Sequence, residues 1–333
     1  MSRRRVTARY VLSHDARDRI YGPEERAAIA ALVDFVGEPL AADEVGPGAL
    51  AGVEVLLSGW GAPLMDARFL DGAPDLRVVL YGAGAVRGFV TPAVWERGIR
   101  VSSANSANAV PVCEYTTAVV LFSLKHGWRL MRQRPDPRDH AATLSPGAYR
   151  STVGIVGLGT IGRLVVAALG RYDVHLVAFD PYCTASEAED LGVRLAGLEE
   201  VFRESDVVSL HAPLYDATRG LVTGDLLRQL RPGATFINTA RGGLVRHGEL
   251  AQVLAERPDL QAVLDVTDPE PLPADHPLLH LENVVLTPHI AGSIGAECHR
   301  MGALVVDELE RYVAGQPLQH EVDPEQLKIS AIP

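Results

Sequence analysis

The chain has 333 residues, 47% hydrophobic and 22% charged, which suits a globular protein with room for two separate cores. Its formal net charge of −11 argues against a nucleic-acid-binding surface, because such a surface needs clustered basic residues. Its three cysteines lie far apart without CxxC spacing, so they fit reduced thiols of a cytoplasmic protein rather than disulfides or a zinc site. No apolar run of membrane-span length and no signal-peptide core is expected.

The first hundred residues alternate between strand-like and helix-like segments. Strands are expected at 6–12, 53–57, 76–80 and 99–102, and helices at 23–36 and 91–97. Such alternation is typical of a parallel sheet with helices on its faces.

One long helix is predicted over 108–131, with Pro111 in its first turn and Glu114 near the positive end of the helix dipole. Residues 116–124 are nearly all apolar, so we expect both sides of this stretch to be buried. The polar, proline-bearing segment 133–149 is predicted to be an exposed excursion.

The segment 151–170 carries the strongest local pattern. A β-branched apolar run passes directly into the motif GLGTIG and then into an amphipathic helix. Gly157 allows a tight turn, Gly159 lets the backbone approach a pyrophosphate, and Gly162 lets the helix pack on the strand. The helix start offers free N–H groups and positive dipole to the phosphates. Because strand and helix both flank the motif, we predict a dinucleotide site.

The next strand, 175–179, ends in Asp180, 18 residues after Gly162. A carboxylate at this point accepts both hydroxyls of an adenosine ribose and repels a 2′-phosphate. The sequence therefore predicts NAD rather than NADP as the cofactor.

The alternation resumes through the rest of the chain. Strands are expected at 207–210, 235–238, 262–266 and 284–286, and helices at 198–203, 224–229, 248–256 and 295–314. The last helix follows the cofactor strands, so we expect it to return to the N-terminal unit. The prediction is an α/β protein with two doubly wound parallel-sheet domains: a discontinuous, flavodoxin-like substrate domain, 1–105 plus 294–333, and a Rossmann NAD-binding domain, 106–293.

Four segments with polar residues follow strands of the second half, where open α/β sheets bind ligands. In these segments the chain resembles the D-isomer-specific 2-hydroxyacid dehydrogenases, most strongly from about Val101 to Gly292. The resemblance lies in the motifs GLGTIG, HAPL, NTARGG, LDV…EP and TPHIAG, in this order. It implies that Arg241, Glu270 and His289 are the catalytic residues.

The resemblance also implies a set of cofactor contacts. Asp265 would hold the nicotinamide carboxamide, and Val112 would pack near the nicotinamide unless it is a core residue. The other residues expected at NAD are Gly157, Gly159, Thr160, Ile161, Gly162, Asp180, Ala212, Pro213, Thr218, Thr239, Ala240 and Gly292. His211 is expected to be structural, and no histidine pair has metal-ligand spacing, so no metal is predicted.

The chemistry of a 2-oxo acid needs the same residue types. Arg241 can grip the carboxylate with its planar fork and polarise the ketone oxygen. His289 can protonate that oxygen as a hydride arrives, or remove the hydroxyl proton in reverse. Glu270 can hold the imidazole in place. Asp268 lies two residues away, but family spacing from Asp265 selects Glu270. A loop arginine, a core histidine and a turn carboxylate are the alternatives.

The N-terminal half supplies the candidate substrate contacts. The segment from Tyr81 through Ala83 and Gly84 resembles the family's glycine loop, whose backbone N–H groups bind the substrate carboxylate. Trp60 is a candidate pocket wall or, equally, a core residue. Arg87, where it is not simply solvated, could meet a second acidic group on the substrate.

The leading hypothesis is an NAD-dependent dehydrogenase that interconverts a D-2-hydroxy acid and its 2-oxo acid in an interdomain cleft. The resemblance implies a homodimer formed through helix 108–131. A phosphite-type dehydrogenase remains an alternative, whereas Glu270 stands where formate dehydrogenases carry glutamine. A non-catalytic, NAD(H)-sensing protein like the related corepressors is the alternative from another class.

Overall fold

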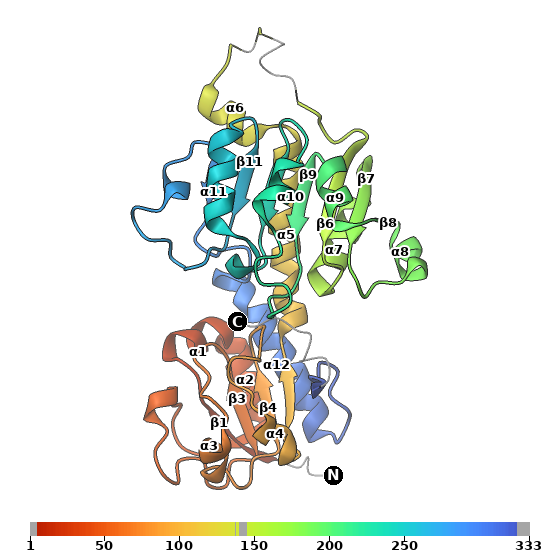
Figure 1. Cartoon of the computed structure of the whole chain (residues 1–333). Coiled ribbons are helices and arrows are strands. Elements are labelled where there is room, and N and C mark those ends of the chain that lie inside the picture. The colour runs from red at the N-terminus through yellow and green to blue at the C-terminus, as the bar shows by residue number, and fades with distance from the viewer. Residues whose placement is uncertain (1–4, 137, 140–144, 325–333) are drawn as a thin grey trace. The chain divides into compact units, whose positions relative to one another are not determined.

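The computed structural model describes residues 5–136, 138–139 and 145–324 (Figure 1). The chain divides into two compact units. Unit 1 comprises Met1–Asn108 and Ser293–Pro333, and unit 2 comprises Ala109–Gly292. The roles predicted for the two domains, substrate binding for the first and cofactor binding for the second, remain predictions from the sequence.

Unit 1 contains a five-stranded parallel sheet in the order β2-β1-β3-β4-β5. Its strands are β1 Val6–Tyr10, β2 Val33–Phe35, β3 Val55–Ser58, β4 Val78–Tyr81 and β5 Arg100–Ser103. Its helices are α1 His14–Ile20, α2 Pro23–Leu32, α3 Ala67–Asp71, α4 Pro92–Glu96 and α12 Cys298–Val313. This strand order is that of flavodoxin-like sheets. Every residue of β3 and β4 is buried, as expected for parallel strands covered on both faces.

Helix α12 joins the C-terminal part of the chain to unit 1. Met301, Val305 and Leu309 recur every fourth residue and are buried in the same core as α1 and α2. Gly302 lies so close to the carbonyl oxygen of Ile20 that a Cβ would come within 2.1 Å of it. The helix predicted at 295–314 therefore exists, but it begins at Cys298 after a short 3₁₀ turn, Gly295–Glu297.

The helix predicted at 23–36 is too long, because α2 ends at Leu32 and Val33–Phe35 form β2. Val33 has an extended backbone and pairs with Val6 of β1. Helix α1 was not predicted, although Ser13 caps it by accepting a hydrogen bond from the Ala16 N–H.

Unit 2 contains a seven-stranded parallel sheet in the order β12-β11-β10-β9-β6-β7-β8. Its strands are β6 Ser151–Val156, β7 Val174–Phe179, β8 Arg194–Leu195, β9 Val207–Leu210, β10 Thr235–Asn238, β11 Gln261–Leu264 and β12 Val284–Leu286. The helices after β6 are α7 Thr160–Leu169, α8 Ala185–Leu191, α9 Leu198–Glu204, α10 Gly224–Arg228 and α11 His247–Glu256. The first six strands in chain order follow the doubly wound dinucleotide-binding order, which confirms the predicted fold class.

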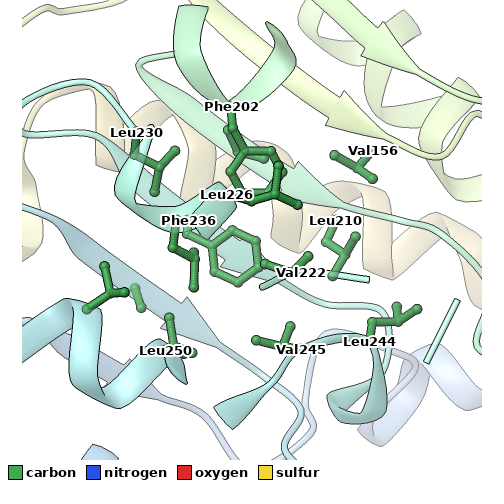
Figure 2. Close-up of a cluster of buried hydrophobic side chains, with 14 of the residues drawn as sticks. Val156, Phe202, Leu210, Val222, Leu226, Leu230, Phe236, Leu244, Val245 and Leu250 are labelled. Atoms are coloured by element: carbon green, nitrogen blue, oxygen red, sulfur yellow. The ribbon is translucent and has the colours of Figure 1, made fainter. Parts of the chain in front are cut away.

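One face of this sheet packs against α9, α10 and α11 through a continuous apolar cluster (Figure 2). Phe202 of α9 stacks on Phe236 of β10 with ring centroids 6.2 Å apart. Leu226 and Leu250 enter the same cluster from α10 and α11. Each such buried side chain contributes about 1.5–3 kcal/mol, so this layer holds the strand ends in fixed positions.

The single long helix predicted at 108–131 is wrong. Two helices occupy the region, α5 Asn105–Leu124 and α6 Gly127–Gln133. They are separated at His126, which has a left-handed backbone with φ of 50°. Gly127 packs so tightly on the Phe122 ring that a Cβ would lie 2.4 Å from it. Because α5 begins three residues early, Pro111 lies inside the helix rather than in its first turn.

Helix α5 also departs from the expectation that no apolar run reaches membrane-span length. Its 20 residues, with a mean hydropathy of 1.3, are long and apolar enough to cross a membrane. However, 56% of the apolar window is buried inside the protein. Val120 and Leu124 pack with Val153 and Ile155 of β6, so this helix has the burial of a core helix.

The excursion predicted at 133–149 lies partly outside the described residues, which omit 137 and 140–144. Within its described part, Tyr149 is 67% exposed, with the Arg150 guanidinium over its ring.

Candidate active site

The GLGTIG motif forms the turn between β6 and α7, and its glycines are sterically required. Gly157 has a φ of 100°, and a Cβ there would lie 2.6 Å from the Ala212 nitrogen. A Cβ on Gly162 would lie 2.0 Å from the Gly157 carbonyl oxygen. At Gly159, by contrast, a Cβ would meet no atom within 4 Å. The turn is therefore packed beneath and open above at the helix N-terminus, which fits the pyrophosphate of a dinucleotide.

Asp180 directly follows β7 and is tied to this turn. Its Oδ2 accepts a hydrogen bond from the Leu158 N–H at 2.6 Å, and its Oδ1 accepts one from the Tyr182 N–H at 2.8 Å. The carboxylate thus lies beside the glycine turn, where the sequence predicts a ribose contact.

The loop after β9 carries His211, Ala212, Pro213 and Thr218. The Thr218 hydroxyl donates to the Pro213 carbonyl oxygen at 2.6 Å and shapes this loop. His211 is buried, with Nε2 2.9 Å from the Ser209 hydroxyl. Burial lowers the pKa of His211 to about 4, so the ring is neutral at pH 7.

The turn after β10 carries Arg241 and is shaped by a buried amide. The Asn238 Oδ1 accepts from the Ala240 N–H at 3.0 Å, and its Nδ2 donates to the Arg241 carbonyl oxygen at 3.0 Å. The Thr239 hydroxyl lies 3.1 Å from the Thr116 hydroxyl of α5. Asn238 stands in the sequence motif NTARGG, but the motif alone did not predict that its side chain fixes this turn.

Gly242 brings the Arg241 turn against the loop that carries Glu270. A Cβ on Gly242 would lie 2.0 Å from the carbonyl of Thr267, so only glycine permits this approach. Burial lowers the pKa of the Arg241 guanidinium, and the Glu270 charge opposes this effect. Arg241 and Glu270 are therefore close enough to interact electrostatically.

Glu270 in turn pairs with His289. The imidazole Nδ1 lies 2.6 Å from the Glu270 Oε1, with the two side chains 49% and 40% exposed. The Glu270 Oε2 accepts from the Thr267 N–H at 3.2 Å. Within the described residues the His289 Nε2 has no hydrogen-bond partner, so this nitrogen is available for a ligand.

Asp265 fixes the segment that presents His289. Its Oδ1 accepts from the Thr287 hydroxyl at 2.6 Å and the Ile290 N–H at 2.8 Å, and its Oδ2 accepts from the Ala291 N–H at 2.9 Å. The His289 N–H donates to the Asp265 carbonyl oxygen at 3.0 Å. The Asp265 side chain, only 2% exposed, therefore anchors the turn that carries His289. The sequence did not predict this role.

The structure thus brings Arg241, Glu270 and His289 together just past the ends of β10, β11 and β12. The glycine turn, Asp180, the Ala212–Pro213 loop and the Thr239–Ala240 turn follow the carboxyl ends of β6, β7, β9 and β10, at the same edge of this parallel sheet. Thr160 and Ile161 begin α7, Val112 is 5% exposed on α5, and Gly292 closes the unit.

The predicted substrate residues lie in unit 1. Tyr81 is 6% exposed and packs on Phe89 with centroids 4.5 Å apart, and burial raises its pKa to about 12. The carbonyl oxygens of Ala83 and Gly84 both accept from the Ser103 hydroxyl, at 3.1 and 2.5 Å. Ser103 therefore fixes the glycine loop.

Trp60 is half-buried between the two apolar clusters of unit 1. The Arg19 guanidinium lies over its ring, 5.1 Å from the centroid.

Comparison with known proteins places this site in a family. Residues 120–291, about half of the chain, match the model of the D-isomer specific 2-hydroxyacid dehydrogenase NAD binding domain. The D-3-phosphoglycerate dehydrogenase of Mycobacterium leprae is 31% identical over 259 residues, which are 77% of this chain but 48% of that protein. The chain spans about half the length of such curated relatives.

Two further comparisons agree. The (S)-sulfolactate dehydrogenase of Chromohalobacter salexigens is 34% identical over 252 residues, 74% of this chain and 81% of that one. The structure of a phosphoglycerate oxidoreductase from Rhizobium etli shares the fold, with a TM-score of 0.80 at 23% identity over 97% of this chain and 100% of that one. Unit 2 is thus an NAD-binding domain, and the chain belongs to the D-isomer specific 2-hydroxyacid dehydrogenase family.

Proposed function

We propose that this protein is an NAD-dependent oxidoreductase that interconverts a D-2-hydroxy acid and its 2-oxo acid. The observation that carries the proposal is the grouping of a guanidinium, a carboxylate and an imidazole, Arg241, Glu270 and His289, at the ligand-binding edge of an NAD-binding domain.

Each of these residues has a distinct part in the proposed reaction. Arg241 binds the substrate carboxylate through its fork and polarises the neighbouring ketone oxygen. His289 gives a proton from Nε2 to that oxygen in reduction and removes it in oxidation. Glu270, bonded to Nδ1, fixes the tautomer and the orientation of the ring. The bound nicotinamide supplies or accepts the hydride.

The proposed cofactor is NAD rather than NADP. Asp180 sits beside the glycine turn with both carboxylate oxygens facing backbone N–H groups of Leu158 and Tyr182. Its negative charge favours ribose hydroxyls and repels a 2′-phosphate at this place. Asp265 and the loop of Ala212 and Pro213 are the further contacts we propose.

The substrate class follows from the same chemistry. A carboxylate next to a hydroxyl or ketone satisfies Arg241 and His289 together. The relatives named above act on phosphoglycerate and sulfolactate, which both carry a second acidic group. A panel of 2-oxo acids with and without such a group is therefore the set to test. The Ala83–Gly84 loop is the proposed carboxylate-binding backbone, with Tyr81 and Trp60 as neighbouring pocket residues.

Turnover and cofactor binding, measured separately, test the proposal. We expect NADH oxidation with at least one acid of the panel, and we expect Arg241→Ala and His289→Ala to abolish it while NADH binding stays within about twofold. Arg203→Ala, at an exposed arginine of α9, is the matched control and keeps full activity. Tight NADH binding without turnover on any acid would contradict the enzyme and favour an NAD(H) sensor.

We infer further that the protein is a cytoplasmic homodimer associated through α5, the main part of the helix predicted at 108–131. Phe122 on this helix is 37% exposed, which suits a surface covered by a second copy. Light scattering after size exclusion tests this inference, and a monomer at micromolar concentration would contradict it.

A further inference from the structure

A shallow, open pocket lies at the end of the unit 2 sheet where β10 and β11 begin. Thr235 and Gln261, the first residues of β10 and β11, line it, and Arg129 and Arg132 reach it from α6. Arg241 and Asp265 follow the opposite ends of the same strands. The pocket is therefore separate from the candidate active site and has no part in the proposed reaction.

One guanidinium donor of Arg129, a residue that lines this pocket, has no hydrogen-bond partner among the described residues. Its Nη2 lies 2.9 Å from the His126 Nδ1, but its Nε is buried and has no partner among the described residues. A buried N–H without an acceptor is costly, and more so on a charged group. An acceptor that arrives from solution would remove this cost.

Arg132 brings a second guanidinium to the same pocket. Its Nη2 donates to the Gln261 Oε1 at 2.8 Å. Burial lowers the pKa of Arg132, while the exposed Glu282 opposes that effect. A negatively charged ligand beside both guanidiniums would offset this desolvation.

Asp259, the acidic residue that lines the pocket, forms an ion pair with Arg257. The two oxygens of Asp259 accept from Arg257 at 2.8 and 2.9 Å, and one of them also accepts from the Gly233 N–H at 3.1 Å. The amide of Asn283 donates to the carbonyl oxygens of three residues at the end of α11 and the following turn. The lining therefore offers positive charge and donors from its two arginines, and its acid is occupied.

We propose that this pocket binds a small oxyanion, a phosphate or the phosphate of a monoester, between Arg129 and Arg132. Guanidinium forks are the protein groups best matched to phosphate oxygens. The buried Nε of Arg129 makes the distinguishing contact, because it gives the anion a donor that no described residue of the protein uses.

Calorimetric titration of the full-length protein with inorganic phosphate tests the proposal at constant ionic strength, with chloride as the comparison salt. The glycine turn of the same unit is a second place for an oxyanion, so the titration is repeated with saturating NADH. We expect one saturable phosphate site per chain that persists when NADH is bound.

The expected variant pattern is specific. Arg129→Gln and Arg132→Gln each weaken phosphate at least about tenfold, as expected for the loss of a charge-assisted contact. Arg203→Gln, on α9 away from the pocket, changes nothing. Should the Arg129 variant fail to fold, Arg132→Gln alone decides, because that side chain is exposed and its replacement leaves the core intact.

Three results would overturn the proposal: no saturable binding, complete competition by NADH, or equal weakening by Arg203→Gln. A parallel titration with glycerol phosphate identifies the source of the anion. Binding tighter than that of inorganic phosphate supports a monoester, and weaker binding supports the free ion.

Discussion

Asp265 offers the sharpest perturbation of the candidate site, because one buried carboxylate holds the whole turn that presents His289. The substitution Asp265→Asn keeps the size of the side chain and removes its charge. The amide oxygen can still accept hydrogen bonds from the Thr287 hydroxyl and the Ile290 N–H. The NH₂ group then faces the Ala291 N–H, which loses its acceptor.

The size of the effect follows from these contacts. A hydrogen bond to a charged group contributes about 1.5–3 kcal/mol, and an orphaned buried donor costs about 1–3 kcal/mol. Because both figures describe the same contact with the Ala291 N–H and add only in part, we expect the closed turn to lose about 2–4 kcal/mol. Amide exchange at Ala291 should then accelerate by about 30- to 1,000-fold, since 1.4 kcal/mol is a factor of ten.

Hydrogen exchange of the protein without cofactor is the assay, because any contact of Asp265 with nicotinamide is then absent. Asp268→Asn is the matched control. That carboxylate is 51% exposed, lies 3.4 Å from Arg219 and should change stability by under about 1 kcal/mol. Unchanged protection of Ile290 and Ala291 in Asp265→Asn would refute the anchoring role.

Three further predictions follow from the site. Gly162→Ala should lower both the urea concentration at the unfolding midpoint and the affinity for NADH, because the new Cβ would collide with the backbone. Gly159→Ala should weaken NADH binding and leave the midpoint unchanged, because its Cβ meets no protein atom. Equal midpoints for the two variants would contradict this prediction. Burial keeps His211 unprotonated in the folded state, whereas the unfolded chain takes up a proton as the pH falls below about 6.5. The free energy of unfolding should therefore fall by about 2 kcal/mol between pH 8 and pH 5, and the loss continues down to the folded-state pKa of about 4. His211→Asn should remove this part of the pH dependence, and an identical pH dependence in the variant would contradict the prediction. Asp180→Ser should raise the affinity for NADPH relative to NADH at least about tenfold by removing a like charge, as fluorescence titration would show, and an unchanged ratio would refute the assignment.

The sequence predicted several elements to the residue, and the reason is local. The strands at 207–210, 235–238 and 284–286 are apolar runs bounded by polar or turn residues, and the structure has the same bounds. The predicted helix 23–36 failed at its end, because Val33 continues the helical apolar spacing while its pairing with β1 makes it extended.

The break between α5 and α6 depended on a tertiary contact. Apolar side chains resume after Lys125 and His126, at Trp128 and Leu130, so the sequence pattern predicts one continuous helix. The reversal at His126 becomes necessary only when Gly127 packs on Phe122. The glycine was the sequence signal that could have located this break.

In the candidate site, too, some features follow from the local sequence and others from tertiary contacts. Motif spacing selected Arg241, Glu270 and His289, which the structure brings together. The groups that hold them, Asn238 and Asp265, could not be assigned these partners from spacing, because their hydrogen bonds join segments that are distant in the sequence or depend on the exact turn.

Transfer of deuterium from NADH deuterated at both C4 positions to a 2-oxo acid tests the central claim most directly. Mass spectrometry and chiral chromatography of the product would measure the label and the configuration at C2. We expect a D-2-hydroxy acid with one deuterium at C2 from the wild type, and no labelled product from His289→Ala or Arg241→Ala. An unlabelled product, an L-acid, or no product from any acid of the panel by a protein that binds NADH would contradict it.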